Sequence, residues 1–294
     1  MLPSAKQSHP ELSAVIELLK PITWFPPMWA FGCGVVSSGV AVQPGDTWRI
    51  VAGVALAGPL VCAASQAVND WYDRDVDAIN EPGRPIPSGR IPGQWGLIIG
   101  VAWSLMSLAV ASFLGPIVLV ATLAGLALAW AYSAPPLRLK QNGWYGNAAC
   151  GLSYEGLAWI TGAAVMLGGW PPMEIVLLAL LYSIAAHGIM TLNDFKSIEG
   201  DRAVGVRSLP VQLGAPKAAL VACAMMIVPQ VVVIVLLDVW GHLLMGGLIT
   251  LSVALQIHCM RRLLTDPKAH APWYNATGVS LLVLGMLVAA IAVR

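Results

Sequence analysis

Charged residues are scarce in this sequence. They make up only 11% of its 294 residues, and hydrophobic residues make up 57%, whereas soluble domains have about 25% charged and about 45–50% apolar residues. The mean hydropathy is +0.74. This composition leaves too little polar surface to cover a water-soluble globule. It therefore excludes an ordinary cytosolic enzyme, a disordered chain and a nucleic-acid-binding protein.

Cysteine pairs and phenylalanine are also lacking. None of the five cysteines belongs to a Cys-x-x-Cys pair, so neither a disulfide framework nor a zinc site is indicated. There are only 4 Phe against 12 Trp, and most of the tryptophans lie near the ends of long apolar runs, as is typical of the aromatic belt at a membrane interface. The N-terminus has no basic and then apolar leader, so we expect no cleaved signal peptide.

Long runs without charge predict membrane spans, because an ionised side chain at the bilayer centre costs about 2.5–3.5 kcal/mol. The longest run is too long for one helix, and Gly115-Pro116 divides it in two. At about 20 residues a span, the sequence predicts an all-α polytopic membrane protein with nine transmembrane helices around a central cavity. The uncharged runs are 21–45, 50–69, 91–137, 141–154, 156–173, 175–193, 218–237, 239–260 and 269–293.

Basic residues indicate the orientation in the membrane. If the N-terminus is cytoplasmic and nine spans alternate, only Arg49 and Arg294 lie on the far side, and the positive-inside rule favours this arrangement. The other 14 basic residues then fall on the cytoplasmic side: Lys6, Lys20, Arg74, Arg84, Arg90, Arg138, Lys140, Lys196, Arg202, Arg207, Lys217, Arg261, Arg262 and Lys268.

The first of two acidic stretches, residues 69–77, reads Asn-Asp-Trp-Tyr-Asp-Arg-Asp-Val-Asp. At 100° per residue, Asp70, Asp73 and Asp77 lie within about 60° of one another on a helix, whereas Asp75 points elsewhere. The first three carboxylates can therefore converge on one point.

The second acidic stretch, residues 193–201, also begins with Asn-Asp, and its Asp194 and Asp201 lie on nearly one helical face. The two Asn-Asp pairs are 124 residues apart, which suggests a decayed four-helix repeat. We expect one membrane-embedded domain, 1–294. Its expected parts are a polar cytoplasmic segment 1–19, repeats at about 20–140 and 141–260, and a ninth helix at about 271–293.

Carboxylates gathered in this way favour divalent cations. Eight of the 15 acidic residues lie in or beside these two stretches, where they would repel one another without a counter-charge. Mg²⁺ takes one or two carboxylates and completes its shell with water and substrate phosphate. Two solvated acidic loops, neutralised by nearby arginines, are the alternative.

A loop with two prolines carries the cations that a diphosphate would need. Pro135-Pro136 cannot continue the preceding helix, and Arg138 and Lys140 follow on the expected side of the acidic stretches. Plain positive-inside anchoring is the alternative for Arg138.

The three motifs together resemble those of the intramembrane aromatic prenyltransferase superfamily, named for the ubiquinone-pathway enzyme. Residues 69–77 match its first aspartate-rich signature, residues 132–140 (Tyr-Ser-x-Pro-Pro-x-Arg-Leu-Lys) its lysine loop and residues 193–201 its second acidic signature. Within that superfamily, residues 19–29, 69–89 and 193–210 are most similar to chlorophyll and bacteriochlorophyll synthases, and the first of these segments is most similar to the bacteriochlorophyll branch. One departure is Ser197, where the superfamily commonly has Asp.

The resemblance implies a Mg²⁺-dependent prenyltransferase. The expected reaction esterifies the ring-D propionate of bacteriochlorophyllide a with a C20 isoprenoid, geranylgeranyl or phytyl, from its diphosphate. It implies two Mg²⁺ ions, bound by Asn69, Asp73, Asp77, Asp194 and Asp201. The diphosphate would be bound by Asn69, Lys140, Arg138, Arg202 and Lys196. The catalytic set that it implies is Asp70, Asp73, Asp77, Asp194, Asp201 and Lys140.

Aromatic faces can stabilise the allylic cation, and Tyr72, Trp71 and Tyr132 are candidates. Glu155 lies inside an expected span, where an acid is a functional candidate, although it could also pair with a neighbour. His187 could bind the pigment magnesium or make an interhelical hydrogen bond. The partners implied are the two substrates and the lipid bilayer, with no nucleic acid. The location implied is a bacterial inner or intracytoplasmic photosynthetic membrane, with the active site on the cytoplasmic face.

Three alternatives stay open at this stage. The acceptor could be chlorophyllide a, a quinone precursor or haem. A membrane transporter would have carboxylates deep within its spans, whereas here only Glu155 lies there. A CDP-alcohol phosphotransferase also uses aspartates and Mg²⁺, but its Gly-Ala-Arg-containing signature is missing.

Overall fold

The computed structural model describes residues 9–294, and this part of the chain is helical throughout, with no strand beyond an isolated bridge between Asn142 and Arg207. The α-helices are α1 (Leu12–Leu19), α2 (Phe25–Ser37), α3 (Thr47–Ala55), α4 (Ala63–Asn80), α5 (Trp95–Leu114), α6 (Pro116–Ser133), α7 (Gly143–Gly151), α8 (Ala158–Leu167), α9 (Met173–Asp194), α10 (Ile198–Ala203), α11 (Leu209–Leu213), α12 (Ala215–Val239), α13 (Leu243–Leu263), α14 (Pro267–Ala276) and α15 (Gly278–Ala292).

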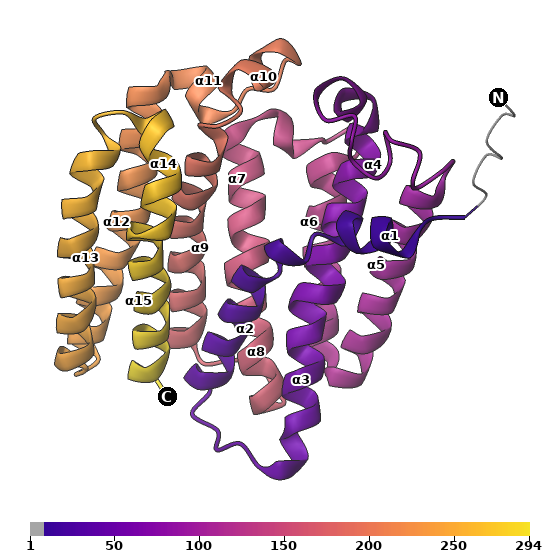
Figure 1. Ribbon diagram of the computed structural model, residues 1–294. Helices are drawn as coiled ribbons and strands as arrows, with labels where there is room; N and C mark the ends of the chain where they lie inside the picture. The colour runs from indigo at the N-terminus through magenta and orange to yellow at the C-terminus, as the bar shows by residue number, and fades with distance from the viewer. Residues whose placement is uncertain (1–8) are drawn as a thin grey trace, which may run out of the picture.

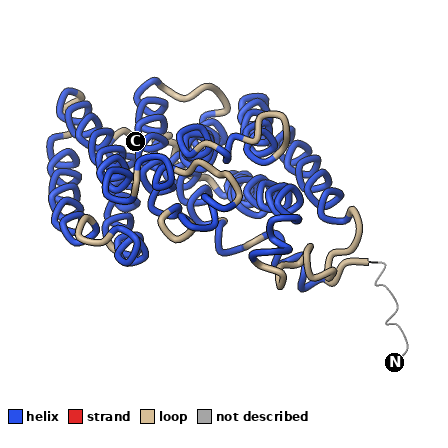
Figure 2. The backbone as a smooth tube through the Cα atoms, turned by 90° about the horizontal axis from the view of Figure 1, so that it is seen from above, coloured by secondary structure: helices blue, strands red, loops and turns tan. Residues whose placement is uncertain are grey.

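The long helices stand side by side in one bundle (Figure 1), and the view from above shows only helices and their connecting loops (Figure 2). Among the described residues, seven helices are long and apolar enough to cross a membrane. The predicted all-α polytopic membrane protein is therefore confirmed, but the predicted count of nine and the four-helix repeat are not. Two helical stretches account for the difference: α2 has only 13 residues, and the stretch at 143–167 is interrupted by polar residues such as Glu155.

The long uncharged run at 91–137 divides where the sequence predicts. Helix α5 ends at Leu114, and Gly115 has a φ of 127°, a conformation that only glycine adopts easily. Pro116 then opens α6, where its missing N–H costs nothing. The two prolines 135 and 136 follow the end of α6 at Ser133, as expected of residues that cannot continue a helix.

Small residues allow close packing in the centre of the bundle. Helices α2 and α8 lie against each other, with Gly34 on the Trp159 carbonyl and Gly162 on the Phe31 carbonyl, and neither glycine has room for a Cβ atom. Close approach through small residues is the usual way in which membrane helices associate, because lipid supplies no hydrophobic drive between them.

Two π-helical turns interrupt the regular helices. They are η3 (Leu56–Cys62), between α3 and α4, and η5 (Leu152–Leu157), between α7 and α8. Pro59 lies inside η3. It has no backbone N–H and so cannot donate a hydrogen bond to the preceding turn. Such turns re-aim side chains within a helix and often occur at functional sites. Both turns contribute residues to the internal cavities described below.

The segment predicted as a polar N-terminus contains helix α1. Ala14 and Leu18 of α1 are buried against Ala63 and Ala67 of α4, so α1 is held on the bundle by its apolar side. Lys20 then adopts a left-handed conformation with φ 48°, which ends α1. Residues 1–8, with the predicted cytoplasmic Lys6, lie outside the described residues.

Candidate active site

The end of α4 and the start of α10 lie at the same end of the bundle (Figure 1), and both contribute residues to the wall of a polar cavity of about 530 Å³. It collects side chains from both acidic stretches and from the loop with two prolines, three segments that are far apart in the sequence. Its charged and amide-bearing wall residues are Asn69, Asp73, Asp77, Asn80, Glu81, Arg84, Arg138, Lys140, Gln141, Asn147, Asp194, Lys196 and Asp201.

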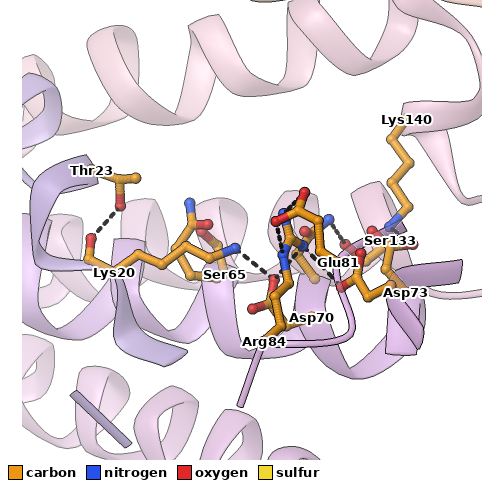
Figure 3. Close-up of polar contacts among 12 residues, drawn as sticks. Lys20, Thr23, Ser65, Asp70, Asp73, Glu81, Arg84, Ser133 and Lys140 are labelled. Carbon is orange, nitrogen blue, oxygen red and sulfur yellow. Dashed lines mark hydrogen bonds and ion pairs between the residues drawn. The ribbon is translucent and has the colours of Figure 1, made fainter. Parts of the chain in front are cut away.

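The first acidic stretch supplies two carboxylates to this cavity. Asp73 lies 2.6 Å from Lys140 Nζ and 3.3 Å from Arg138 Nη2, and Asp77 lies 2.9 Å from Arg84 Nη1. Figure 3 shows Lys140 extending from its loop toward Asp73. Asp75, which the helical angle excluded, has a side chain that is 87% exposed.

Asp70 takes a different place from its neighbours. It is 2% exposed, pairs with Lys20 Nζ at 2.6 Å and lies 3.6 Å from Arg84 Nη1. It is not among the residues that line the polar cavity. Figure 3 shows Lys20 reaching across to Asp70 from the segment that precedes α2. The structure therefore places Asp70 where it holds Lys20 and Arg84, whereas Asp73 and Asp77 face the cavity.

The second acidic stretch reaches the cavity from the opposite side, through the end of α9 and the start of α10. Asn147 Nδ2 donates to Asp194 Oδ2 at 3.3 Å, and Ser197 Oγ donates to Asp201 Oδ2 at 3.0 Å. Ser197, which stands where the superfamily commonly has Asp, thus orients the Asp201 carboxylate. Glu199 points away and pairs with Lys268 at 2.7 Å.

The loop after α6 brings two cations into the same space. Arg138 has a φ of 39°, a left-handed conformation that is uncommon outside glycine, asparagine and aspartate, and it turns the chain so that Lys140 follows into the cavity wall. The Lys140 side chain is only 10% exposed. Burial lowers the pKa of its ammonium group, and the charge of Asp73 opposes that shift.

The cavity wall also keeps donors without a protein partner. Ser208 Oγ and Arg138 Nε are buried and make no hydrogen bond within the described residues, although both residues line the cavity. A buried donor left unpaired is costly, so these two groups indicate an acceptor that the protein itself does not supply. Oxygen-rich anions are the class of ligand that offers such acceptors.

The same wall fits Mg²⁺ bound together with a diphosphate. Between residues 9 and 294, no group of three or more His, Cys, Asp or Glu side chains is close enough to hold an ion by itself. Carboxylates instead face one another across the cavity in small numbers. That arrangement matches the usual coordination of Mg²⁺ in enzymes, in which one or two carboxylates and substrate phosphates are the ligands.

Two apolar cavities continue from the polar one. Asn69 and Tyr132 belong to the walls of both the polar cavity and a narrow cavity of about 160 Å³ between α2, α4, α6 and α7. Gln66, Cys150 and Tyr154 in turn join the narrow cavity to a wide one of about 680 Å³, between α2, α9 and α15. The arrangement places a charged cavity beside the narrow apolar cavity, and the wide apolar cavity on the other side of the narrow one.

The remaining predicted residues divide between these walls and other parts of the bundle. Tyr132 lines the polar and the narrow cavity, and Glu155 lines the wide one. In the described structure Trp71, Tyr72, His187 and Arg202 line none of the three cavities. Trp71 packs under the Arg74 guanidinium, Tyr72 contacts the ring of Trp130, and His187 contacts the ring of Trp144.

Sequence reasoning missed several residues of these walls, among them Gln66, Asn147, Tyr154 and Ser208. Gln66 Nε2 donates to the Tyr154 hydroxyl at 3.1 Å, where the narrow and wide cavities meet. Asn147 and Tyr154 are seven residues apart in one helical stretch, as Asp70 and Asp77 are. Tyr154, however, lies in the π-helical turn η5, so regular helical spacing does not place the two residues on one face. Uncharged polar residues in an apolar helix were the available signal.

Comparison with known proteins gives consistent matches over nearly the whole chain. The model of the UbiA prenyltransferase family matches residues 28–291. The chain is 56% identical to the bacteriochlorophyll synthase 33 kDa chain of Cereibacter sphaeroides, over 98% of this chain and 95% of that protein. It is 40% identical to the chloroplastic chlorophyll synthase of Arabidopsis thaliana, over 94% of this chain and 73% of that protein.

Solved structures show the same fold at lower sequence identity. A digeranylgeranylglyceryl phosphate synthase has a TM-score of 0.74 at 23% identity, with 95% of this chain and 98% of that chain covered. A UbiA homologue from Archaeoglobus fulgidus, solved with DMAPP and Mg²⁺, has a TM-score of 0.70 at 19% identity, with 96% and 100% covered.

Proposed function

Since the chain belongs to the UbiA prenyltransferase family, we propose that it esterifies the ring-D propionate of bacteriochlorophyllide a with a C20 isoprenoid from its diphosphate. The isoprenoid is geranylgeranyl or phytyl. The observation that carries the proposal is the charged cavity, which shares Tyr132 and Asn69 with the wall of a neighbouring apolar cavity. High identity to a bacteriochlorophyll synthase supports the choice of acceptor.

The diphosphate occupies the polar cavity in this proposal. Mg²⁺, when bound, supplies positive charge that stabilises the departing diphosphate. The residues that would hold it are Asn69, Asp73 and Asp77 from α4, and Asp194 and Asp201 from the other side, enough for two ions. Ser197 keeps the Asp201 carboxylate oriented through its 3.0 Å hydrogen bond.

Basic groups supply the rest of the positive charge. Lys140, Arg138 and Lys196 line the cavity, and the unpartnered Arg138 Nε and Ser208 Oγ donate to diphosphate oxygens. Arg202 lies on α10 beside Asp201 and contributes at longer range. Donors already fixed in place stabilise the charge that develops on the leaving group without further reorganisation.

We place the allylic end of the prenyl chain in the narrow cavity. Its wall is mainly apolar, so an allylic cation formed there is shielded from water. Tyr132 lies at the junction with the polar cavity, where its ring face can stabilise the cation. Tyr154 closes the other end of the same compartment.

We place the acceptor in the wide cavity, which at about 680 Å³ is the larger of the two apolar cavities and is lined mainly by apolar residues. The propionate is a carboxylate and is ionised near neutral pH. No strong protein base is therefore needed for it to attack the allylic carbon.

The membrane arrangement completes the proposal. We place α2 and the helical stretch at 143–167 with the seven candidate spans as a nine-helix bundle in the bacterial inner or intracytoplasmic photosynthetic membrane. The N-terminus and the polar cavity face the cytoplasm, as the basic residues indicate. The whole chain acts as one domain, with repeats at about 20–140 and 141–260.

An acceptor panel tests the function. Membranes containing the protein receive geranylgeranyl diphosphate and Mg²⁺ with bacteriochlorophyllide a, chlorophyllide a or 4-hydroxybenzoate as acceptor, and products are separated by mass. We expect the geranylgeranyl ester of bacteriochlorophyllide a to form fastest. Prenylated 4-hydroxybenzoate as the main product would assign the protein to quinone synthesis instead.

A further inference from the structure

Glu155 is a buried acid that the proposed chemistry does not use. It lies in the π-helical turn η5, is 7% exposed and belongs to the wall of the wide cavity. Its Oε2 atom has no hydrogen-bond partner among the described residues. Buried polar atoms without partners are rare in native proteins, and each requires an explanation.

The surroundings of Glu155 contain no counter-charge. The described wall of the wide cavity has no Lys, Arg or His. An uncompensated charge in such surroundings is far more costly than a neutral group, so the carboxyl is kept in its acid form. A protonated carboxyl carries one O–H donor. The wide cavity therefore offers a hydrogen-bond donor to whatever occupies it.

The other polar groups of this wall are mostly used within the protein. Gln66 donates to Tyr154, and Thr23 donates to the Lys20 carbonyl at 2.8 Å. Asn275 Nδ2 donates to Asn193 at 3.2 Å, and its unpartnered Oδ1 is an acceptor. That acceptor lies beside the second acidic stretch, at the reacting end of the cavity. Tyr154 accepts from Gln66 and Cys62 at the border with the narrow cavity, and Glu155 is the acid of this wall whose carboxyl has an unpartnered atom.

The position of Glu155 along its helical stretch fixes which part of a ligand it meets. Asn147, in the wall of the polar cavity, is eight residues earlier in the same helical stretch. That separation corresponds to about 12 Å along the axis. A bacteriochlorophyllide whose propionate reaches the diphosphate would therefore present to Glu155 a group on the edge of the macrocycle remote from the propionate.

Two ketone groups of bacteriochlorophyllide a are candidate acceptors for a hydrogen bond from Glu155. The keto group of the fifth ring lies next to the propionate. The C3-acetyl group lies on ring A, on the side of the macrocycle remote from the propionate. Only the acetyl group matches a donor about two helical turns from the polar cavity. Chlorophyllide a has a vinyl group at this position and cannot accept a hydrogen bond there.

We propose that Glu155 is a specificity-determining residue that donates a hydrogen bond to the C3-acetyl oxygen of bacteriochlorophyllide a. The inference rests on the proposed function, because it requires the pigment to occupy the wide cavity. It assigns to one side chain the preference between acceptors with acetyl and vinyl groups at C3.

The test compares two acceptors that differ only at C3: bacteriochlorophyllide a and its 3-vinyl analogue. Full-length wild type, Glu155→Leu and Glu155→Gln are assayed in detergent with geranylgeranyl diphosphate and Mg²⁺. For the wild type we expect kcat/KM to be about tenfold higher with the acetyl acceptor, which corresponds to about 1.4 kcal/mol. The ratio should fall to about one in Glu155→Leu and persist in Glu155→Gln, whose amide N–H can donate to the same oxygen.

A matched control and the wild type make the outcomes distinct. Glu174 is exposed at the start of α9 and is absent from the described walls of these three cavities, so Glu174→Leu should keep the wild-type ratio. Equal kcat/KM values for both acceptors in the wild type, or an unchanged ratio in Glu155→Leu, would overturn the inference while leaving the proposed function intact. A wild type that esterifies neither pigment would overturn the proposed function itself.

Discussion

We expect Asp73→Ala to lower turnover by about 10³-fold, which is the upper range for removal of one group that stabilises a leaving oxyanion. Asp73 is the carboxylate that meets both Lys140 and Arg138 in the polar cavity. Its loss removes a proposed metal ligand and leaves two cations without their partner. The measurement is the rate of ester formation by purified protein at saturating diphosphate.

Asp75→Ala is the matched control for this variant. Asp75 lies two residues away on the same helix, but its side chain is 87% exposed and lies 3.9 Å from its neighbour Arg74. We expect its turnover to stay within about twofold of the wild type, as for surface substitutions generally. Size-exclusion profiles of both variants establish that the protein is folded. An Asp73→Ala variant as active as Asp75→Ala would refute the place given to the first acidic stretch.

Removal of Mg²⁺ should have an effect of similar size. In excess chelator we expect turnover to fall below about 1% of the wild-type value and to return when Mg²⁺ is added in excess. The physical reason is electrostatic: Asp73, Asp77, Asp194 and Asp201 share the cavity wall, and a diphosphate beside them is repelled unless divalent cations lie between. Continued esterification in the presence of chelator would contradict the metal-dependent account.

The same experiment has an internal control. If the chelator removed an ion that the fold itself needs, the unfolding temperature of the substrate-free protein would fall. No described group of three His, Cys, Asp or Glu side chains can hold an ion alone, so we expect the unfolding temperature without diphosphate to be unchanged by chelator. With diphosphate present, Mg²⁺ should raise the unfolding temperature, because a ligand that binds only the folded state stabilises that state.

Part of the fold and the candidate site could be predicted from local patterns. Gly115-Pro116 divides α5 from α6 because both residues impose their backbone preferences locally. The helical angle separated Asp75 from Asp73 and Asp77 for the same reason, since α4 is regular there. These features depend on residues within a few turns of one another.

Other features depend on partners that are distant in sequence. The helical angle grouped Asp70 with Asp73 and Asp77. Asp70 does share Arg84 with Asp77, but its closest partner is Lys20, 50 residues away. The aromatic candidates Trp71 and Tyr72 share the helix of Asp73 yet pack elsewhere. Tyr154 reaches the cavities through a π-helical turn, and the regular periodicity of the sequence does not reveal such a turn.

The helix count shows a further limit of charge-free runs. The run at 21–45 is long enough for a span. Its first residues, however, form a separate short turn, η1 (Pro21–Thr23), and α2 ends at Ser37, so residues 38–45 lie outside the helix. A run without charge therefore indicates that a segment can lie in the membrane. It does not indicate how long the helix within that segment is, because prolines and glycines can divide it.

The most direct test of the account follows the oxygen atoms of the acceptor. Bacteriochlorophyllide a with both propionate oxygens labelled with ¹⁸O is converted with unlabelled geranylgeranyl diphosphate and Mg²⁺, and the ester is analysed by mass spectrometry. The account predicts that both labels stay in the ester, because the bond that breaks joins the allylic carbon to the diphosphate. Loss of one label would show that the propionate carbonyl is activated instead, and would contradict it.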